Sequence, residues 1–346
     1  MVTLSGMSEA IPVAVVGCGR MGRLHARVFS QMPAVRLVGV LDADADAADE
    51  VGMQHGAARL ESLDEVASVA RAAVIATPTT THLAVAAPLL ERGIACFIEK
   101  PLAGSSDEAR QLVELARAHD AVLQVGHIER FNPAVRAMQR LNIRPGFVEV
   151  TRISPLTFRS IDVGVVLDVM IHDIDIVLNL VRSEVVDVQS AGVSVIGGGS
   201  ASRPAEDLCN ARLRFANGCV ANLTASRLAL KVERRLRVFS DDAYVSLDYQ
   251  KKYGIVVKRS GNLEALRDVV ARLRRGEIED LSQLDYRQIV QVEELTIDDA
   301  EPARAQLDAF IAAFKGQAPV PVSGSDGLAA VELAERIVAA IPAKAL

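Results

Sequence analysis

Three segments of the chain contain polar side chains at spacings that suit the chemistry of a small molecule. Glu99–Pro101 follows a short apolar run, Asp168 and His172 are four residues apart in a longer apolar stretch, and Gly126–Pro133 reads GHIERFNP. Side chains at i and i+4 lie on one face of a helix, so both polar groups could face one substrate. A histidine there can accept a hydroxyl proton, and an aspartate can hold substrate or orient the imidazole.

Lys100 ends the run Ala95–Ile98 and Glu99, where it is expected beside a cationic ring. Partial desolvation near a positive charge weakens the hold of an ammonium on its proton, which suits proton transfer or hydrogen bonding to a reacting oxygen. Each residue also has a structural interpretation. Lys100 could be a solvated lysine at a strand end, and His172 a core histidine with Asp173 and Asp175 on the solvated side of its helix. Neither HExxH nor a cysteine cluster accompanies His172, so we expect no metal.

Gly17-Cys18-Gly19-Arg20-Met21-Gly22 follows a predicted strand and precedes a predicted helix. In a G-x-G-x-x-G turn the first glycine permits the tight turn, the second admits a pyrophosphate and the third allows close packing of the helix. The helix N-terminus then offers N–H donors to phosphate. Strand, glycines and helix together predict a dinucleotide site.

Asp42 ends the second predicted strand, where an acid should bind the ribose diol of the adenosine. The following residues, Ala43–Glu50, contain four acids and no lysine or arginine. A 2′-phosphate would be repelled there, so we expect NAD in preference to NADP. The alternative is a chance glycine turn, with Asp42 an ordinary strand-end cap.

Residues 10–125 alternate short apolar runs with amphipathic stretches, which predicts a doubly wound parallel sheet of the α/β, Rossmann class. The carboxyl ends of such strands meet at one edge, where ligands bind. We expect Ser62–Glu65 to be a capping box, and Ser106 to cap a helix that runs through Ala118. The expected strands are Val13–Val16, Val35–Leu41, Val74–Ala76, Ala95–Ile98 and Val122–Val125.

Residues 126–346 predict a second, α+β domain with a largely antiparallel open sheet, for substrate binding and oligomerisation. Asn217-Gly218 is a hairpin signal between two apolar strands. The polar segment Ser260–Arg287 reads as a helical excursion. The expected helices are Pro133–Leu141, Val163–Val181, Ala303–Phe314 and Gly327–Ile341, the last two of which could pack back on the first domain.

Composition excludes several classes of protein. The 346 residues carry 38 Lys plus Arg against 44 Asp plus Glu, a formal net charge of −6 that does not suit a nucleic-acid binder. Apolar runs are too short to cross a bilayer, and the four cysteines are too sparse for a disulfide framework. We therefore expect a cytoplasmic protein with neither a nucleic-acid nor a membrane partner.

Arginine is concentrated between Val125 and Ser160, a segment that contains six arginines and only two glutamates. In an acidic protein such a cluster suits an anionic substrate such as a nucleotide sugar. Arg136 and Arg140 fit a solvated helix face, whereas Arg130 and Arg159 are the better candidates.

Taken together, GCGRMG, Glu99–Pro101, Gly126–Pro133 and Asp168-x3-His172 resemble the glucose–fructose oxidoreductase, inositol dehydrogenase and rhizopine-catabolism (Gfo/Idh/MocA) family, over nearly the whole chain. The resemblance implies that Lys100, Asp168 and His172 are catalytic. It implies substrate contacts for these three and for His127, Arg130, Phe131 and Arg159, although His127-Ile-Glu129 departs from the GxNxRF of many members. The implied dinucleotide contacts are Gly17, Gly19, Arg20, Met21, Gly22, Asp42, Thr77, Pro78, His82, Glu99 and Lys100.

Within the family, the segments from Arg159 to Asp175 and from Ala211 to Arg227 resemble the branch of UDP-N-acetylglucosamine 3-dehydrogenases of diamino-sugar lipid A synthesis. That resemblance implies a UDP-sugar substrate, a PLP-dependent aminotransferase as the next enzyme, and a homodimer or homotetramer. His172 would take the hydroxyl proton while Lys100 supports charge on the oxygen. The alternatives are a dehydrogenase of another sugar, an inositol or a UDP-sugar acid, a redox-neutral family member, and a non-enzymatic NAD-binding regulator.

Overall fold

The computed structural model describes residues 10–156, 163–196, 199–200, 203–259, 263–277 and 290–342. The chain divides into two units that interleave along the sequence. Unit 1 comprises Met1–Phe131, Val166–Asp175 and Ala300–Ala339, and unit 2 comprises Asn132–Val165, Ile176–Asp299 and Ala340–Leu346. The division of the sequence into domains at 10–125 and 126–346 stays a prediction.

Unit 1 is built on a six-stranded parallel sheet in the order β3-β2-β1-β4-β5-β6. This is the strand order of the dinucleotide-binding doubly wound fold, and it confirms the predicted α/β class. The strands are β1 (Ile11–Val16), β2 (Val35–Leu41), β3 (Ala58–Arg59), β4 (Ala72–Ile75), β5 (Ala95–Glu99) and β6 (Leu123–Gly126). The helices between them are α1 (Arg20–Ser30), α2 (Ala45–His55), α3 (Leu63–Val69), α4 (His82–Leu90) and α5 (Ser106–Ala118), with 3₁₀ turns at Thr79–Thr81 and Ile128–Phe131.

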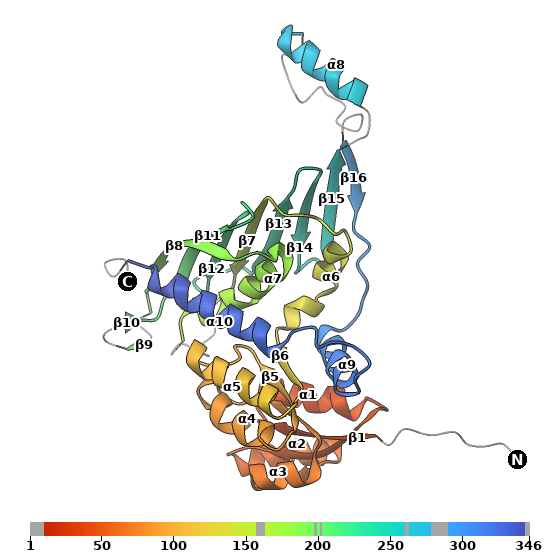
Figure 1. Ribbon diagram of the computed structural model, residues 1–346, viewed down its shortest axis with the longest axis vertical. Coiled ribbons are helices and arrows are strands. Elements are labelled where there is room, and N and C mark those ends of the chain that lie inside the picture. The colour runs from red at the N-terminus through yellow and green to blue at the C-terminus, as the bar shows by residue number, and fades with distance from the viewer. Residues whose placement is uncertain are drawn as a thin grey trace, which may run out of the picture. The chain divides into compact units, whose positions relative to one another are not determined.

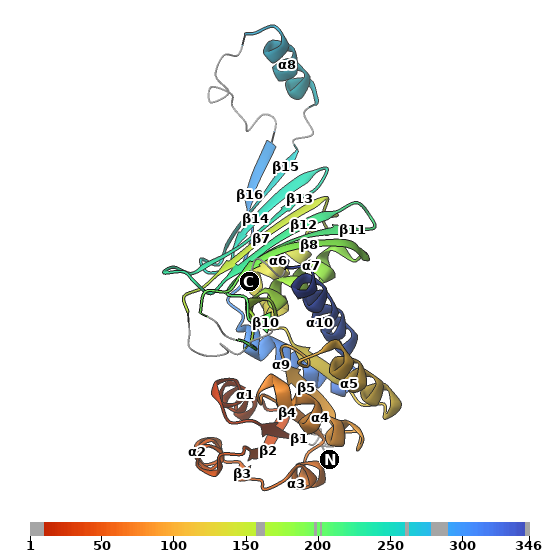
Figure 2. The same ribbon diagram turned by 90° about the vertical axis from the view of Figure 1, so that its left-hand side faces the viewer.

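Helices cover both faces of this sheet, and a separate apolar core lies on each face. Phe29 of α1 and Val51 of α2 pack on one side, together with Phe310 from near the C-terminus. Leu89 of α4 and Leu112 of α5 pack on the other. Figure 2 shows α1 and α2 on one side of the sheet and α4 and α5 on the opposite side. The strands β1, β4, β5 and β6 are buried on both faces, as expected for a parallel sheet, whereas the edge strand β3 is exposed.

Two helix starts test the predicted caps. Ser62 accepts a hydrogen bond from the Glu65 N–H at 3.2 Å, as predicted. The Glu65 carboxylate reaches the N–H of Glu61 and not that of Ser62, so only half of the capping box forms. The cap of α5 was wrong by one residue, because Ser105 accepts from Glu108 N–H while the backbone of Ser106 is already helical.

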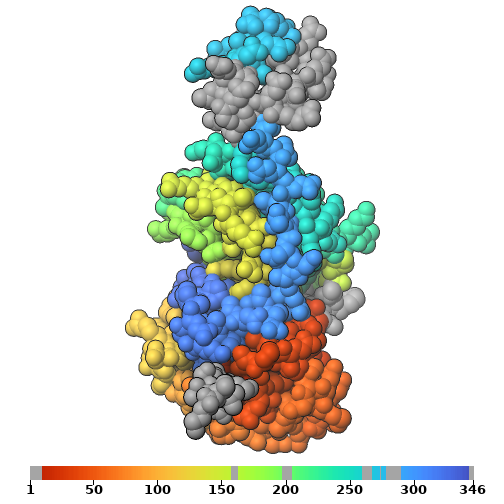
Figure 3. All heavy atoms as spheres, turned by 90° about the vertical axis from the view of Figure 1, so that its right-hand side faces the viewer, coloured from red at the N-terminus to blue at the C-terminus, as the bar shows by residue number. Residues whose placement is uncertain are grey.

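Unit 1 is completed by helices α9 (Pro302–Phe314) and α10 (Gly324–Ala339). α9 packs against α1, and α10 packs against α5 and β6. Figure 3 shows the blue atoms of these C-terminal helices directly against the red and orange atoms of the N-terminal elements. Gly324 and Gly327 allow α10 to approach closely, since a Cβ at either would come within 2.7 Å of a side chain on the sheet.

Unit 2 is built on an eight-stranded sheet in the order β16-β15-β14-β13-β7-β12-β11-β8. Every pairing is antiparallel except that of β7 with β12, which confirms the predicted, largely antiparallel sheet. Helix α6 (Pro133–Gln139) packs against β14, and Figure 1 shows it crossing one face of the sheet. The strands are β7 (Phe147–Ile153), β8 (Val185–Val193), β11 (Leu208–Phe215), β12 (Val220–Ser226), β13 (Glu233–Phe239), β14 (Ala243–Asp248), β15 (Tyr253–Arg259) and β16 (Val290–Glu294), with a small pair β9 (Gly199–Ser200) and β10 (Arg203–Pro204).

The predicted hairpin at Asn217-Gly218 joins β11 and β12, and Gly218 has the positive φ of +88° that the turn requires. Burial alternates along β11, with Cys209, Ala211 and Leu213 buried and the intervening side chains exposed. This period of two places one face of the sheet against helices and leaves the other face polar.

The long helix predicted at Val163–Val181 is not α-helical throughout, because its first turns differ from the prediction. The segment Val166–Met170 is π-helical, and the α-helix α7 spans Ile171–Val181. The predicted excursion after β15 contains helix α8 (Leu263–Arg274), and its residues 260–262 and 278–287 lie outside the described ranges. Within the described residues, none of the helices is both long enough and apolar enough to span a membrane.

Candidate active site

The glycine-rich turn joins β1 to α1 with the geometry that its glycines allow. Gly17 has a φ of +97°, and a Cβ there would lie 2.6 Å from the carbonyl of Ala76. A Cβ at Gly22 would lie 1.7 Å from the Gly17 carbonyl oxygen, so only glycine lets α1 begin this close to the turn. A Cβ at Gly19 would meet nothing within 4 Å, which leaves space for a ligand.

The N-terminus of α1 is available to a phosphate. Gly19 precedes the helix without a side-chain cap, and Arg20 and Met21 form its first turn with no acidic residue among them. Helix N–H groups and the positive end of the helix dipole favour a bound anion. The open space at Gly19 and the uncapped helix start therefore fit a dinucleotide diphosphate.

Asp42 follows β2 and contacts the glycine turn directly. One carboxylate oxygen accepts from the Cys18 N–H at 2.5 Å, and the other accepts from the Asp44 N–H at 2.9 Å. Asp42 therefore fixes the turn that would hold the phosphates. Its predicted contact with ribose stays a prediction. Burial, followed by the charge of Asp42, raises the pKa of the neighbouring Cys18 thiol to about 11.

Thr77 and Pro78 follow β4, the strand that lies beside β1 where the order of the sheet reverses. In open α/β sheets this reversal is where ligands bind. The Thr81 hydroxyl donates to Thr77 Oγ1 at 2.9 Å and to the Pro78 carbonyl at 2.8 Å, which ties the loop together. Thr77 and Pro78 are thus placed at the same strand ends as Gly17.

His82, predicted to contact the cofactor, is only 1% exposed. Its Nδ1 lies 3.1 Å from the Pro101 carbonyl and 3.2 Å from that of Leu102, and its Nε2 lies 3.0 Å from the Thr77 carbonyl. Burial lowers the pKa of His82, and hydrogen bonding to these carbonyls opposes the shift. The imidazole bridges the loops after β4 and β5, and its cofactor contact stays a prediction.

Lys100 and Asp168 lie together, as the resemblance implies for catalytic residues. The Lys100 ammonium donates to the backbone carbonyl of Asp168 at 2.6 Å and lies 3.3 Å from its carboxylate. The two side chains are 19% and 30% exposed, so a ligand can still reach them. Lys100 extends from the end of β5, and Asp168 lies in the π-helical turn of the same unit.

His172 belongs to the first turn of α7, four residues after Asp168, and is partly buried. The segment Val166–Asp175 groups with unit 1, so Lys100, Asp168 and His172 belong to one unit. The structural alternative placed Asp173 and Asp175 in solvent, and it was wrong, because each is 1% exposed.

Three predicted substrate contacts, His127, Arg130 and Phe131, are buried just after β6. The Arg130 guanidinium donates to both carboxylate oxygens of Asp175 at 2.7 Å and to the Pro321 carbonyl at 3.1 Å. This pairing accounts for Arg130 without a substrate. Phe131 belongs to an apolar core of unit 1. The substrate contacts of these residues stay predictions.

His127 is 1% exposed, and within the described residues neither ring nitrogen has a hydrogen-bond partner. Burial lowers its pKa, as do Arg130 and Lys100, whereas Asp175 and Glu99 oppose the shift. His127 therefore lies neutral among the charged groups of the site.

The arginine cluster predicted to bind an anion is partly neutralised. Besides Arg130, Arg140 pairs with Asp298 at 3.2 Å, and the guanidinium of Arg152 lies 5.7 Å from the ring centre of Tyr249. Arg159, the other favoured arginine, lies outside the described residues.

Sequence reasoning missed two buried partners of this site. His25 on α1 hydrogen-bonds to Glu99, with Nε2 2.6 Å from Oε1, and Asp175 holds Arg130. The signal for His25 was present, because it lies three residues after Gly22 on the same helix. Asp175 gave no such signal, because nothing in the sequence separates a buried aspartate from an exposed one.

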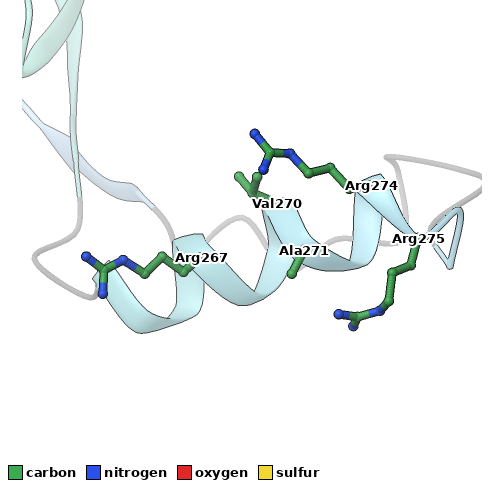
Figure 4. A pocket seen from close by; sticks show the side chains of 5 residues that line it. All are labelled: Arg267, Val270, Ala271, Arg274 and Arg275. Carbon is green, nitrogen blue, oxygen red and sulfur yellow. The ribbon is translucent and has the colours of Figure 1, made fainter.

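A pocket separate from the candidate active site lies on helix α8. Figure 4 shows Arg267, Arg274 and Arg275 around Val270 and Ala271, with the arginines extending in different directions from one helix. Among the side chains that the structure describes, no acid or histidine lines it, so those residues offer no group for proton transfer. Across the described ranges, no cluster of His, Cys, Asp or Glu is arranged to hold a metal ion.

Comparison with known proteins agrees with this geometry. Residues 11–127 match the Gfo/Idh/MocA oxidoreductase family with its NAD-binding Rossmann fold, and residues 152–246 match a Gfo/Idh/MocA C-terminal domain. UDP-N-acetylglucosamine 3-dehydrogenase of Acidithiobacillus ferrooxidans is 36% identical over 236 residues, which cover 68% of this chain and 73% of that protein. The chain belongs to the Gfo/Idh/MocA family.

Two further comparisons cover nearly the whole chain. Inositol 2-dehydrogenase of Rhizobium meliloti is 28% identical over 346 residues, covering 95% of this chain and 96% of that protein. A solved structure of the Acidithiobacillus ferrooxidans enzyme superposes with a TM-score of 0.84 at 29% identity, covering 96% of this chain and 98% of that one. This Gfo/Idh/MocA protein is an NAD-dependent sugar dehydrogenase.

Proposed function

We propose that this enzyme oxidises the 3-hydroxyl of UDP-N-acetylglucosamine to a ketone, with NAD as the hydride acceptor. The observation that carries the proposal is the 36% identity over 236 residues with an enzyme of that name. The product would be a 3-keto nucleotide sugar. A ketone at that carbon is the substrate that a PLP-dependent aminotransferase needs, so we propose such an enzyme as the next step, in lipid A synthesis.

The catalytic roles are assigned to Lys100, Asp168 and His172. His172 accepts the proton of the sugar hydroxyl as the C–H bond breaks. Lys100 donates a hydrogen bond to the oxygen as it becomes a ketone, which stabilises the developing negative charge. Asp168 holds the ammonium of Lys100 in place through the 2.6 Å contact of its carbonyl and the 3.3 Å contact of its carboxylate.

NAD supplies the hydride acceptor when bound. Gly17, Gly19 and Gly22 with the first turn of α1 (Arg20 and Met21) would hold its diphosphate, and Asp42 its adenosine ribose. Thr77 and Pro78 follow β4, whereas Glu99 ends β5 and Lys100 comes directly after it. These four residues would line the nicotinamide end. In net terms, the carbon that bears the hydroxyl would lose a hydride to bound NAD, and the hydroxyl oxygen would lose its proton to His172.

A cyclic polyol such as an inositol is the second candidate substrate. What favours it is coverage, since inositol 2-dehydrogenase aligns with 95% of this chain. The same Lys100, Asp168 and His172 chemistry would serve a ring hydroxyl on either substrate. We also propose that residues 126–346 form the substrate-binding and oligomerisation domain of a homodimer or homotetramer.

The decisive experiment incubates the purified enzyme with NAD and a panel of UDP-sugars and inositols, and measures reduced nicotinamide by absorbance. Trapping the ketone with a PLP-dependent aminotransferase pulls an unfavourable equilibrium forward. We expect turnover with UDP-N-acetylglucosamine and an amino sugar in the trapped reaction. Turnover with an inositol alone would refute the nucleotide sugar, and a preference for NADP would refute the assigned role of Asp42.

A further inference from the structure

A buried acid–histidine pair connects the glycine-turn helix to the segment that carries Lys100. His25 of α1 is fully buried, and its Nε2 lies 2.6 Å from Oε1 of Glu99, whose side chain is 10% exposed. His25 also packs edge-on against Phe97, with ring centres 5.2 Å apart. The pair is thus enclosed between α1 and the last residue of β5, which is Glu99 itself.

The other oxygen of Glu99 points along the chain toward the proposed catalytic lysine. Oε2 accepts from the backbone N–H of Lys100 at 3.3 Å. A Cβ at Gly126 would lie 3.1 Å from the Glu99 carboxyl carbon and from Oε2, so the glycine at the end of β6 leaves the space that this carboxylate fills. Hydrogen bonds therefore run from His25 through Glu99 to Lys100, and from Lys100 to Asp168.

We propose that His25 is a positioning residue: its bond to Glu99 holds that carboxylate against the Lys100 backbone and away from the Lys100 ammonium. This rests on the role of Lys100 in the proposed function. A buried carboxylate is costly unless it is paired and hydrogen-bonded. Without His25, we expect Glu99 to pair with the ammonium of the adjacent residue Lys100, which then turns from Asp168 toward Glu99.

Two substitutions should change the reactivity of the Lys100 amine in opposite directions. Loss of His25 leaves Glu99 seeking the Lys100 ammonium, which makes the amine less reactive. Loss of the Glu99 charge removes that competitor, which makes the amine more reactive. A residue that only filled space in the core would not produce changes of opposite sign.

The test compares His25→Leu, His25→Gln and Glu99→Gln with the wild-type enzyme. His25→Gln is the conservative variant, because the side-chain amide nitrogen that it introduces can take the place of Nε2. His119→Gln is the matched control, because His119 is exposed at the end of α5. Reactivity is read without substrate, by competitive acetylation with acetic anhydride and mass spectrometry of Lys100 against the exposed Lys251.

In His25→Leu we expect acetylation of Lys100 to slow at least about threefold, and in Glu99→Gln to quicken about as much, because a nearby opposite charge favours the protonated amine. With UDP-N-acetylglucosamine and NAD, kcat should fall about 10- to 100-fold in His25→Leu, less than the roughly 10²–10⁴-fold of a positioned acid–base group, because His25 acts only through Glu99 and Lys100. KM should change little. His25→Gln should recover most of both properties, and His119→Gln should match the wild type.

Equal acetylation of Lys100 in all variants would overturn the proposal, as would changes of the same sign in His25→Leu and Glu99→Gln. If His25→Leu does not fold, Glu99→Gln still tests the proposal, because acetylation of Lys100 that is unchanged or slower in Glu99→Gln would overturn it. A wild-type enzyme without activity on the nucleotide sugar would refute the proposed substrate. It would leave the acetylation result, and so this inference, intact.

Discussion

Two ion pairs join the ends of β5 and β6 to the same short stretch of helix, and they differ in almost every physical respect. Arg130 and Asp175 are 8% and 1% exposed, and both carboxylate oxygens accept from the guanidinium at 2.7 Å. Lys100 and Asp168 are 19% and 30% exposed, and ammonium and carboxylate are 3.3 Å apart.

The difference separates a structural pair from a reactive one. The Arg130 guanidinium already donates to Asp175 and to the Pro321 carbonyl, and it lies 3.5 Å from Asp326. Removing either partner of the buried pair leaves an uncompensated charge. A partly exposed ammonium with one long contact to a carboxylate can exchange that contact for a substrate oxygen. The same helical segment is thus anchored by Asp175 and presents Asp168, seven residues earlier, to the ligand side.

Replacement of Lys100 by Met should have the largest effect on the reactive pair. We expect kcat to fall about 10²–10⁴-fold, because the developing charge on the sugar oxygen loses its donor. NAD affinity, measured by titration, should remain within a few-fold. Lys251→Met is the control, since Lys251 is exposed. A Lys100→Met enzyme with wild-type turnover would contradict the assignment, as would an equally active His172→Ala enzyme.

Replacement of Arg130 by Met should break the structural pair. We expect the free energy of unfolding to fall by about 3–5 kcal/mol, because Asp175 is left buried and charged. Denaturant titration measures the loss.

The double variant Arg130→Met with Asp175→Leu removes both charges, and it should recover most of the stability, since buried pairs can often be replaced by apolar residues. If the double variant is less stable than Arg130→Met, an uncompensated charge on Asp175 is not what destabilises the single variant.

Replacement of Asp168 by Asn sharpens the comparison from the other side. The Lys100 ammonium keeps its 2.6 Å bond to the backbone carbonyl, which the substitution leaves in place. We therefore expect kcat to fall only about tenfold, which is less than the roughly 10²–10⁴-fold effect of one positioned acid–base group. Because the pair is partly exposed, unfolding free energy should change by less than about 1 kcal/mol. A loss of stability like that of Arg130→Met would show that the two pairs are alike.

The sequence was sufficient for the nucleotide half of the molecule because its signals are local. Gly17 and Gly22 each have a steric reason visible within a few residues, and Asp42 lies at a strand end. The alternation of apolar runs predicted the class of the first sheet correctly, although β3 (Ala58–Arg59) was not among the expected strands. The cap at Ser105 was missed because Ser105 and Ser106 are equivalent in type, and only the backbone conformation distinguishes them.

The partners of the catalytic segment could not be predicted in the same way. The pairs His25–Glu99 and Arg130–Asp175 join residues 74 and 45 positions apart. Such contacts depend on how helices pack on the sheet, which a pattern of residue types does not specify. The π-helical turn at Asp168 was missed for a related reason, because its sequence has the same apolar composition as the α-helix that follows.

The smallest expected effect concerns His127, which lies between the two pairs and faces Lys100, Glu99, Arg130 and Asp175. Burial lowers its pKa in the folded protein, so below about pH 6.5 the unfolded chain binds a proton first, and acid favours unfolding. His127→Leu should therefore lose less Tm than the wild type between about pH 7 and pH 5. Thermal unfolding at both pH values measures this, with His119→Gln as the exposed control. Some loss of Tm at low pH should persist in His127→Leu, because burial lowers the pKa of His82 as well. An unchanged pH dependence in His127→Leu would mean that the pKa of His127 is the same in the folded and the unfolded protein, and it would contradict the lowering of that pKa by burial.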